Sequence, residues 1–221
     1  MGTLVWGTVG QRTFETGTDR GVLYPMSSEG TYPKGVAWNG LTGVSESPSG
    51  AEANAKYADN IKYLNLVSAE EYAATINAFG SPKEFDECDG TAEIAKGVFA
   101  HQQTRKAFGF SWRTLIGNDI EGQDHGYKIH IVYNAMAKPS SKDYETINDS
   151  PEAIGLSWEL STTPVAVPGH KPTAKLTINS TLVDAAKLQA LEEKLYGNAT
   201  LEAHLPTPTE IIALIGTEAA G

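Results

Sequence analysis

The residues best suited to bind a metal ion lie in the segment NDIEGQDHG, which gathers Asp119, Glu121, Asp124 and His125 within a few positions. Oxygen ligands of this kind suit calcium, but their spacing does not follow the EF-hand loop. The glycines in and around the segment lie where a hairpin turn requires them. The sequence therefore favours a turn between two strands, and it leaves open whether the 119–125 turn also binds a cation.

No other group of residues has the spacing of a catalytic or metal site. Glu70 and Glu71 are adjacent, so their carboxylates point to opposite faces of a strand or diverge by about 100° on a helix, and cannot act together as general acid and base. The five histidines are isolated from one another, and His130 is predicted to point outward from its strand. No nucleophile elbow, phosphate-binding loop, dinucleotide-binding turn or CxxC pair occurs. We therefore expect no enzymatic activity, no cofactor and no metal, although a site assembled from distant loops would leave no local motif.

The charge of the chain argues against nucleic-acid recognition. Its net charge is −10, from 17 basic and 27 acidic residues, and no basic stripe gathers to neutralise phosphates. The densest acidic patch, EFDECDGTAE, is interpreted as a solvated rim. Cys88 lies within it, and a lone cysteine among acidic neighbours is predicted to be an inert, packed thiol.

The length and hydropathy of the chain indicate one soluble domain over residues 1–221. With 40% hydrophobic residues, the chain can bury a sizeable core. The N-terminus has no basic region before an apolar segment, and no apolar run is long enough to span a bilayer. We expect the protein to be made and kept in the cytosol, without a membrane partner.

Alternating residues predict several strands. FGFSWRTLI is predicted to be a half-buried strand with Phe108, Phe110 and Trp112 facing the core. YKIHIVY follows after the turn, with Ile129, Ile131 and Tyr133 inward, so the two segments predict a long hairpin. IGLSWELS repeats the pattern, with inward residues Ile154, Leu156, Trp158 and Leu160. Further strands are predicted in GVLYP, GVAWNGLT, IKYLNLV and AKLTIN.

One helix is predicted at about 184–196, followed by a short C-terminal tail. Asp184 is the expected N-cap, Gly197 closes the helix, and the residues that pack on the sheet are Leu188, Leu191 and Leu195. The segment SAEEYAATINAF is ambiguous. Ser68 and Glu71 could form a capping box, yet ATINAF before a Gly-Ser-Pro stop could equally be a strand.

The segment GVSESPSGAEANAKYADN, residues 43–60, has no apolar periodicity and lies between two strand-like segments. Such a stretch is a linker, a lid or an arm that grips a partner. Too few residues precede it to form a separate domain, and no catalytic groups were found for a lid to cover. An arm is favoured over a passive loop, with the candidate assembly residues Ser45, Glu46, Ser47, Pro48, Tyr57, Asp59 and Asn60.

Six segments in the same order between Asp19 and Gly197 carry a family resemblance. They are DRGVLYP, GVAWNGLTGVSESPSGAEANAKYADNIKYLNL, PKEFDECDG, FGFSWRTLIGNDIEGQDHGYKIHIVY, NDSPEAIGLSWELSTTPV and LQALEEKLYG. Together they resemble the major tail protein, or tail tube protein, of long-tailed non-contractile bacteriophages. An ordered match over most of the chain is more specific than a short motif.

The resemblance implies a mainly β (α+β) fold, in which two packed antiparallel β-sheets form a sandwich or partial barrel with a flanking α-helix. Six copies would close into a ring, and stacked rings would form the tube through which phage DNA is ejected. The implied partners are other copies of the chain and the tape measure, tail terminator and distal tail proteins, with DNA only in transit. The implied location is the virion tail, after assembly in the host cytoplasm.

The resemblance also bears on single segments. It favours the strand for ATINAF and a short helical turn in PKEFDEC, and it implies that the 43–60 loop reaches adjoining subunits. The segment ATLEAHLPTPTEIIALIGTEAAG after the helix is too short for the immunoglobulin-like domain that some relatives carry.

Two other classes of function remain open. The first is a β-sandwich receptor- or carbohydrate-binding phage module, in which Trp38 and Trp112 would stack on sugars, although their strand positions favour the core. The second is a hydrolase with a carboxylate pair assembled from distant parts of the chain.

Overall fold

The computed structural model describes residues 3–147 and 149–216. Antiparallel strands dominate it, and the largest sheet has eight strands in the order β2-β1-β11-β12-β13-β8-β3, with β16 also paired to β12. These strands are β1 Phe14–Pro25, β2 Val36–Ala37, β3 Leu41–Glu46, β8 Ala73–Ala78, β11 Phe108–Asn118, β12 Gly122–Ala137, β13 Leu156–Thr162 and β16 Lys175–Asn179. The expected mainly β fold with antiparallel pairing is confirmed.

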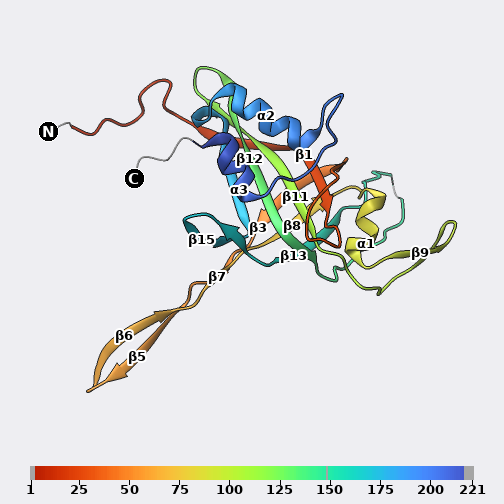
Figure 1. The fold of residues 1–221 in the computed structure, drawn as a ribbon, viewed down its shortest axis with the longest axis horizontal. Coiled ribbons are helices and arrows are strands. Elements are labelled where there is room, and N and C mark those ends of the chain that lie inside the picture. The colour runs from red at the N-terminus through yellow and green to blue at the C-terminus, as the bar shows by residue number, and fades with distance from the viewer. Residues whose placement is uncertain (1–2, 148, 217–221) are drawn as a thin grey trace.

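The large sheet forks along one edge of β12. Lys128–Val132 pair with β16, whereas Ala135–Ala137 pair with β13. Beyond the fork, β13, β8 and β3 form a second layer (Figure 1). The sheet curls until Leu41 of β3 packs against Gly21 of β1. The two layers expected from the sequence are therefore two halves of one sheet, curled into a partial barrel.

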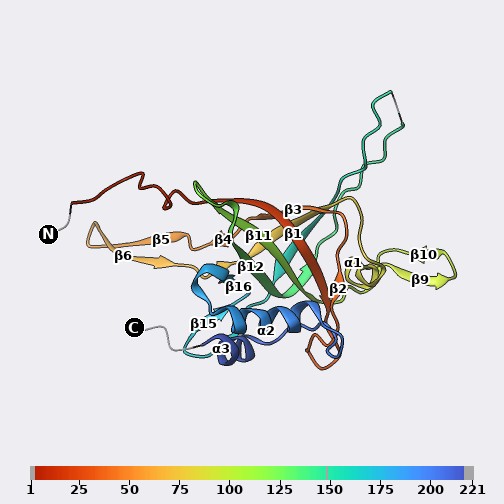
Figure 2. The same ribbon diagram turned by 90° about the horizontal axis from the view of Figure 1, so that it is seen from above.

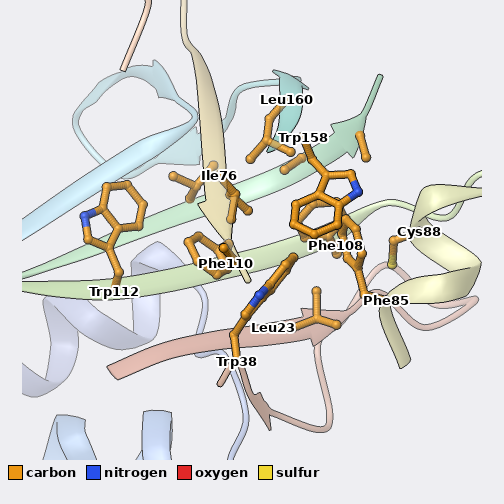
Figure 3. Packing of buried hydrophobic residues seen from close by; sticks show 14 residues of the cluster. Leu23, Trp38, Ile76, Phe85, Cys88, Phe108, Phe110, Trp112, Trp158 and Leu160 are labelled. Atoms are coloured by element: carbon orange, nitrogen blue, oxygen red, sulfur yellow. The ribbon is translucent and has the colours of Figure 1, made fainter. Parts of the chain in front are cut away.

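Aromatic side chains fill the space between the two halves of the sheet (Figure 3). The ring of Trp38 lies 4.7 Å from Phe85, 5.5 Å from Phe110 and 5.5 Å from Trp158, measured between centroids. Its Nε1 donates to the Gly80 carbonyl at 2.8 Å, so the one polar atom of this side chain is paired. Cys88 lies fully buried at the rim of this cluster, and burial raises the pKa of its thiol to about 12. Edge-to-face ring pairs of this kind fix the packing of the core beyond simple apolar burial.

Two helices cover the opposite face of β1, β11 and β12 (Figure 2). The predicted helix is α2, Ala185–Tyr196, in which the Asp184 side chain accepts from two backbone amides and Leu188, Leu191 and Leu195 are buried. The second helix, α3, Pro208–Ile215, lies where the sequence predicts only a short C-terminal tail. A capping box between Thr207 and Glu210 begins it, and Ile211 packs into the same cluster. The last five residues of the tail, 217–221, lie outside the described residues.

The hairpin of β11 and β12 is buried on both faces, which corrects the prediction of a half-buried hairpin. Trp112 pairs with His130 across the ladder. Residues directly opposite in an antiparallel pair share a face, so His130 points into the aromatic core beside Trp112 and is not outward. It is 8% exposed, and its ring stacks on Trp112 with centroids 4.9 Å apart. Ile129, Ile131 and Tyr133 instead face the helices.

The remaining elements are short. ATINAF contains β8, as the resemblance favoured, and PKEFDEC contains the 3-10 turn η1 Lys83–Phe85 and helix α1 Asp86–Asp89. The others are β4 Ser49–Gly50, β5 Ala53–Ala58, β6 Ile61–Val67, β7 Glu70–Glu71, β9 Ala92–Ala95, β10 Val98–Ala100, β14 Val165–Val167, β15 His170–Thr173 and η2 Ser180–Leu182. Ile154, expected inward, precedes β13 and is exposed.

Within residues 3–147 and 149–216, no helix has the length and apolar character needed to cross a membrane.

Candidate assembly surface

The most prominent feature of the surface is an arm, residues 47–71, that projects from the body between β3 and β8 (Figures 1 and 2). It consists of two successive ladders, in which β4 pairs with β7 and β5 pairs with β6. Every residue of β6 is exposed, as is nearly all of β5. The arm therefore lies outside the core of its own chain.

The tip of the arm is a two-residue hairpin turn. Asp59 and Asn60 both adopt positive φ angles, 51° and 59°, between the paired residues Ala58 and Ile61. A type I′ turn requires positive φ at both central positions, and Asp and Asn tolerate this conformation better than most residues. Local chemistry thus explains why the chain reverses here without glycine.

The arm exposes apolar side chains on both of its faces. Leu64 and Leu66 lie on one face, opposite Lys56 and Asn54. Val67 lies on the other face, opposite Ala53, and Tyr57 shares that face because it is four positions from Ala53 in the same strand. Tyr57 is 72% exposed, and Leu66 and Val67 are 55% and 62% exposed. A two-stranded hairpin is marginally stable in water at best, and the described part of the chain covers neither face of this one, so both faces are candidate contact surfaces for a partner.

The structure corrects the boundaries of the predicted 43–60 loop. Ser45 and Glu46 belong to β3 and pair with β8 in the body, whereas Ser47 and Pro48 begin the arm. Tyr57, Asp59 and Asn60 lie at or next to the tip. The segment IKYLNLV, predicted as a strand after the loop, is strand β6 and forms half of the arm. The signal that was missed is the Asp-Asn turn between two short stretches able to pair as strands.

Three other projections also expose apolar side chains. They are the N-terminal segment 3–13, the hairpin of β9 and β10, and residues 138–147 and 149–155 of the loop before β13 (Figure 2). Their exposed large apolar residues are Leu4, Val5, Trp6, Val9, Ile94, Val98, Phe99, Tyr144, Ile147 and Ile154. Apolar groups at several projections are typical of a subunit that contacts more than one neighbour.

The acidic turn between β11 and β12 uses its carboxylates within the chain. Asp119 accepts from the Gly10 amide at 2.8 Å and lies 3.8 Å from the Arg12 guanidinium. Glu121 lies 2.6 Å from Nδ1 of His125. Within the described residues, no three His, Cys, Asp or Glu side chains converge as a metal site would require. The turn thus pins the N-terminal segment to the body.

The acidic patch around α1 is less isolated than its sequence suggests. Lys83 lies 2.6 Å from Glu93, and Lys106 lies 3.1 Å from Glu87. Lys142, from the 138–155 loop, lies 3.1 Å from Asp89. The patch is therefore a partly neutralised rim, because the adjacent Lys83 and the more distant Lys106 and Lys142 pair with its carboxylates.

A hollow of about 820 Å³ lies between the 26–33 loop, β14 and the start of α3. Three of the polar groups that line it form hydrogen bonds within the fold. The Tyr32 hydroxyl accepts from the Asn134 amide at 2.9 Å, the Tyr133 hydroxyl donates to the Pro206 carbonyl at 2.9 Å, and Glu210 accepts from the Thr207 amide at 2.7 Å. These groups do not form the nucleophile, base and orienting residue of a hydrolytic site.

The aromatic residues considered for sugar stacking are not available for it. Trp38 and Trp112 are each 3% exposed and lie in the aromatic core. A sugar ring stacks on an exposed aromatic face, so neither residue supports the carbohydrate-binding alternative.

Comparison with known proteins gives faint structural likenesses. No family model and no curated protein matches the chain. One solved structure, the six-fold symmetrised baseplate of the anti-feeding prophage, contains a chain that is 9% identical with a TM-score of 0.37, over 74% of this chain and 95% of that one. A chain of the PVC sheath-tube complex, an extracellular contractile injection system, is 13% identical with a TM-score of 0.31, over 72% and 88% of the two chains. Likenesses this weak carry no functional conclusion.

Proposed function

We propose that this chain is a structural virion protein of a bacteriophage tail, which self-assembles into stacked hexameric rings that form the tail tube for DNA ejection. The observation that carries the proposal is the arm, whose two apolar faces project away from the body and lack cover from their own chain. The ordered sequence resemblance to tail tube proteins supplies the identity of the partner, a second copy of the same chain.

The body of the subunit suits a rigid building block. The β11–β12 hairpin is packed on both faces, so the body is a well-packed base from which the arm and the other projections extend. In this proposal the tape measure, tail terminator and distal tail proteins contact the ends or the lumen of the tube. The chain acts without catalysis, cofactor or metal, and its place is the virion tail after assembly in the host cytoplasm.

Electron microscopy of the purified protein over a range of concentrations tests the proposal. We expect rings with six-fold symmetry, and tubes of stacked rings at high concentration. Particles that remain single subunits at every concentration, or that form closed assemblies without stacking, would contradict it. A receptor-binding module or a hydrolase has no need to stack into tubes, so tubes of stacked rings are the discriminating result.

The charge of the chain leads to a second expectation. DNA in transit must not adhere to the tube wall, and a net charge of −10 repels phosphates. The purified protein is expected to show no measurable affinity for double-stranded DNA at physiological salt. Micromolar binding in a fluorescence anisotropy titration would contradict the role of DNA as passing cargo.

A further inference from the structure

The two residues that flank the arm contact the same lysine, which comes from a different part of the sheet. Glu46 ends β3 just before the arm begins, and Tyr72 follows β7 just after the arm ends. The Nζ of Lys175, the first residue of β16, forms a hydrogen-bonded ion pair with Glu46 and lies 5.8 Å from the centroid of the Tyr72 ring. Both connections between the arm and the body therefore contact the same ammonium group.

Lys175 reaches these residues across the fork of the sheet. β16 pairs with β12, whereas β3 and β8 belong to the layer that begins at β13. The Lys175 side chain therefore joins two layers that diverge at this point. Within the described strands, no β-ladder joins β16 directly to β3 or β8. The contact made by the Lys175 side chain therefore restricts the angle between the two layers.

The Lys175 ammonium lies over a pair of stacked rings, Trp112 and His130. Its Nζ lies 5.7 Å from the Trp112 ring centroid, and Trp112 stacks on His130. Thr114 Oγ1 lies 2.9 Å from Nε2 of His130, and Thr177 Oγ1 lies 3.4 Å from Nδ1. Both imidazole nitrogens have a hydroxyl partner, so the His130 and Trp112 rings beneath Lys175 have little freedom to move.

Lys175 is the better covered partner of the ion pair, and Glu46 is exposed. The side chains of Lys175 and Glu46 are 20% and 36% exposed, so water screens their attraction in part, and the geometry of the contact carries more weight than its electrostatic energy. Burial and the nearby Glu46 raise the pKa of the Tyr72 hydroxyl. The carbonyl of Tyr72 also accepts from Thr162 Oγ1 at 2.6 Å, which ties the end of the arm to β13.

We propose that Lys175 is a positioning residue that, through Glu46 and Tyr72, sets the direction in which the arm leaves the body. The arm continues from this root as a two-stranded ladder, and a small change of angle at the root moves the tip by a much larger distance. The benefit of a fixed direction rests on the proposed function, because it would align the arm with its site on the next copy. The direction itself is a property of the single subunit.

The test measures the distance between spin labels on the tip and the body of the isolated subunit by pulsed electron paramagnetic resonance. The labels are attached at Lys62→Cys, an exposed position of β6 beside the tip turn, and at Ala166→Cys, an exposed position of β14. The native Cys88 is fully buried with its thiol pKa raised to about 12, so it does not compete for the label. Dilution with excess unlabelled protein removes distances between subunits.

We expect Lys175→Met to broaden the distance distribution about twofold, and Lys175→Arg to keep it narrow because the charge and its reach are retained. Lys128→Met is the matched control, since it breaks the ion pair with Glu15 elsewhere in the same sheet and should leave the distribution unchanged. Glu46→Gln removes the ion pair with little change of shape, so it keeps the test decisive if Lys175→Met folds poorly.

A distribution as narrow in Lys175→Met and Glu46→Gln as in the parent would overturn the proposal, whether or not the protein forms tubes. Equal broadening in Lys128→Met would also overturn it, because the effect would then be general loosening. Conversely, broadening in the Lys175 and Glu46 variants of a protein that never forms rings would support the positioning role while contradicting the proposed function.

Discussion

The β11–β12 hairpin and the β5–β6 hairpin are built from the same local structure but have opposite surroundings. Both are antiparallel pairs with alternating side chains and short turns. The first is covered on one face by the aromatic core and on the other by two helices. The second is exposed to solvent on both faces although both carry apolar residues. Strand formation therefore does not distinguish them, and the difference lies in where each finds its partners.

The comparison separates two roles within one subunit. Burial of apolar surface stabilises the central hairpin during folding of the single chain. The apolar side chains of the arm stay exposed in the single chain, so their burial can contribute free energy only on contact with another molecule. Substitutions in the central hairpin should change the free energy of unfolding, whereas those in the arm should change assembly.

The largest difference is expected between two aromatic residues. Trp112→Ala removes a buried ring that contacts Phe110 and His130, and should lower the free energy of unfolding by about 3–5 kcal/mol. Tyr57→Ala in the arm should change it by less than about 0.5 kcal/mol. Urea unfolding of both variants measures this. A comparable loss for Tyr57→Ala would show that the arm belongs to the folded core.

The next largest effect concerns pH. Burial, with a smaller contribution from the nearby Lys175, lowers the pKa of His130 from its ordinary value near 6.5 to about 4. Between these values the unfolded chain binds the proton and the folded chain does not, so stability falls as pH falls from about 6.5 towards 4. The loss should reach roughly 2–3 kcal/mol at pH 4.5.

His130→Asn isolates this contribution, because it removes the titrating group whatever it does to stability at neutral pH. Unfolding free energies of parent and variant are compared at pH 7 and pH 4.5. We expect a shallower decline in the variant. Equal declines would show that His130 titrates normally and that the Trp112 face of the hairpin admits water.

The smallest effect on the isolated subunit is expected from the faces of the arm. Leu64→Ser with Leu66→Ser alters one face, and Tyr57→Ser with Val67→Ser alters the other. Each pair should change the free energy of unfolding by less than about 1 kcal/mol, yet each should prevent tube growth in turbidity and electron microscopy. Assembly that survives one of the pairs would show that partners cover a single face.

Much of the fold follows from the sequence where local signals are strong. The alternation around Trp112 and Trp158 indicates strands, and Asp184 with its leucine stripe indicates the α2 helix. The faces of the β11–β12 hairpin did not follow, because alternation says that two faces differ but not that a second core lies behind one of them. Ile129 and Trp112 were assigned to one core and belong to two.

The sequence indicated only part of the arm. The segment 43–60 was singled out because it lacks apolar periodicity, yet its second half pairs with IKYLNLV to make the arm. The residues at Asp59 and Asn60 carried the turn signal. The role of Lys175 could not be found from sequence, because it lies 129 positions from Glu46 and meets it only through the fork of the sheet.

The central claim is that the arm finds its partners on other copies, and shortening the arm tests it most directly. Gly50 and Glu70 are paired, so Ala51–Ala69 can be replaced by Asn-Gly, the preferred two-residue turn, without disturbing β3 or β8. The control keeps the arm and changes only its tip, Asp59→Asn with Asn60→Gly.

Melting temperature and electron microscopy are compared for the parent, the shortened variant and the control. We predict that all three melt at the same temperature, that parent and control form tubes, and that the shortened variant remains unassembled. Ordinary tubes from the shortened variant would contradict the account, and so would a subunit that cannot fold without its arm.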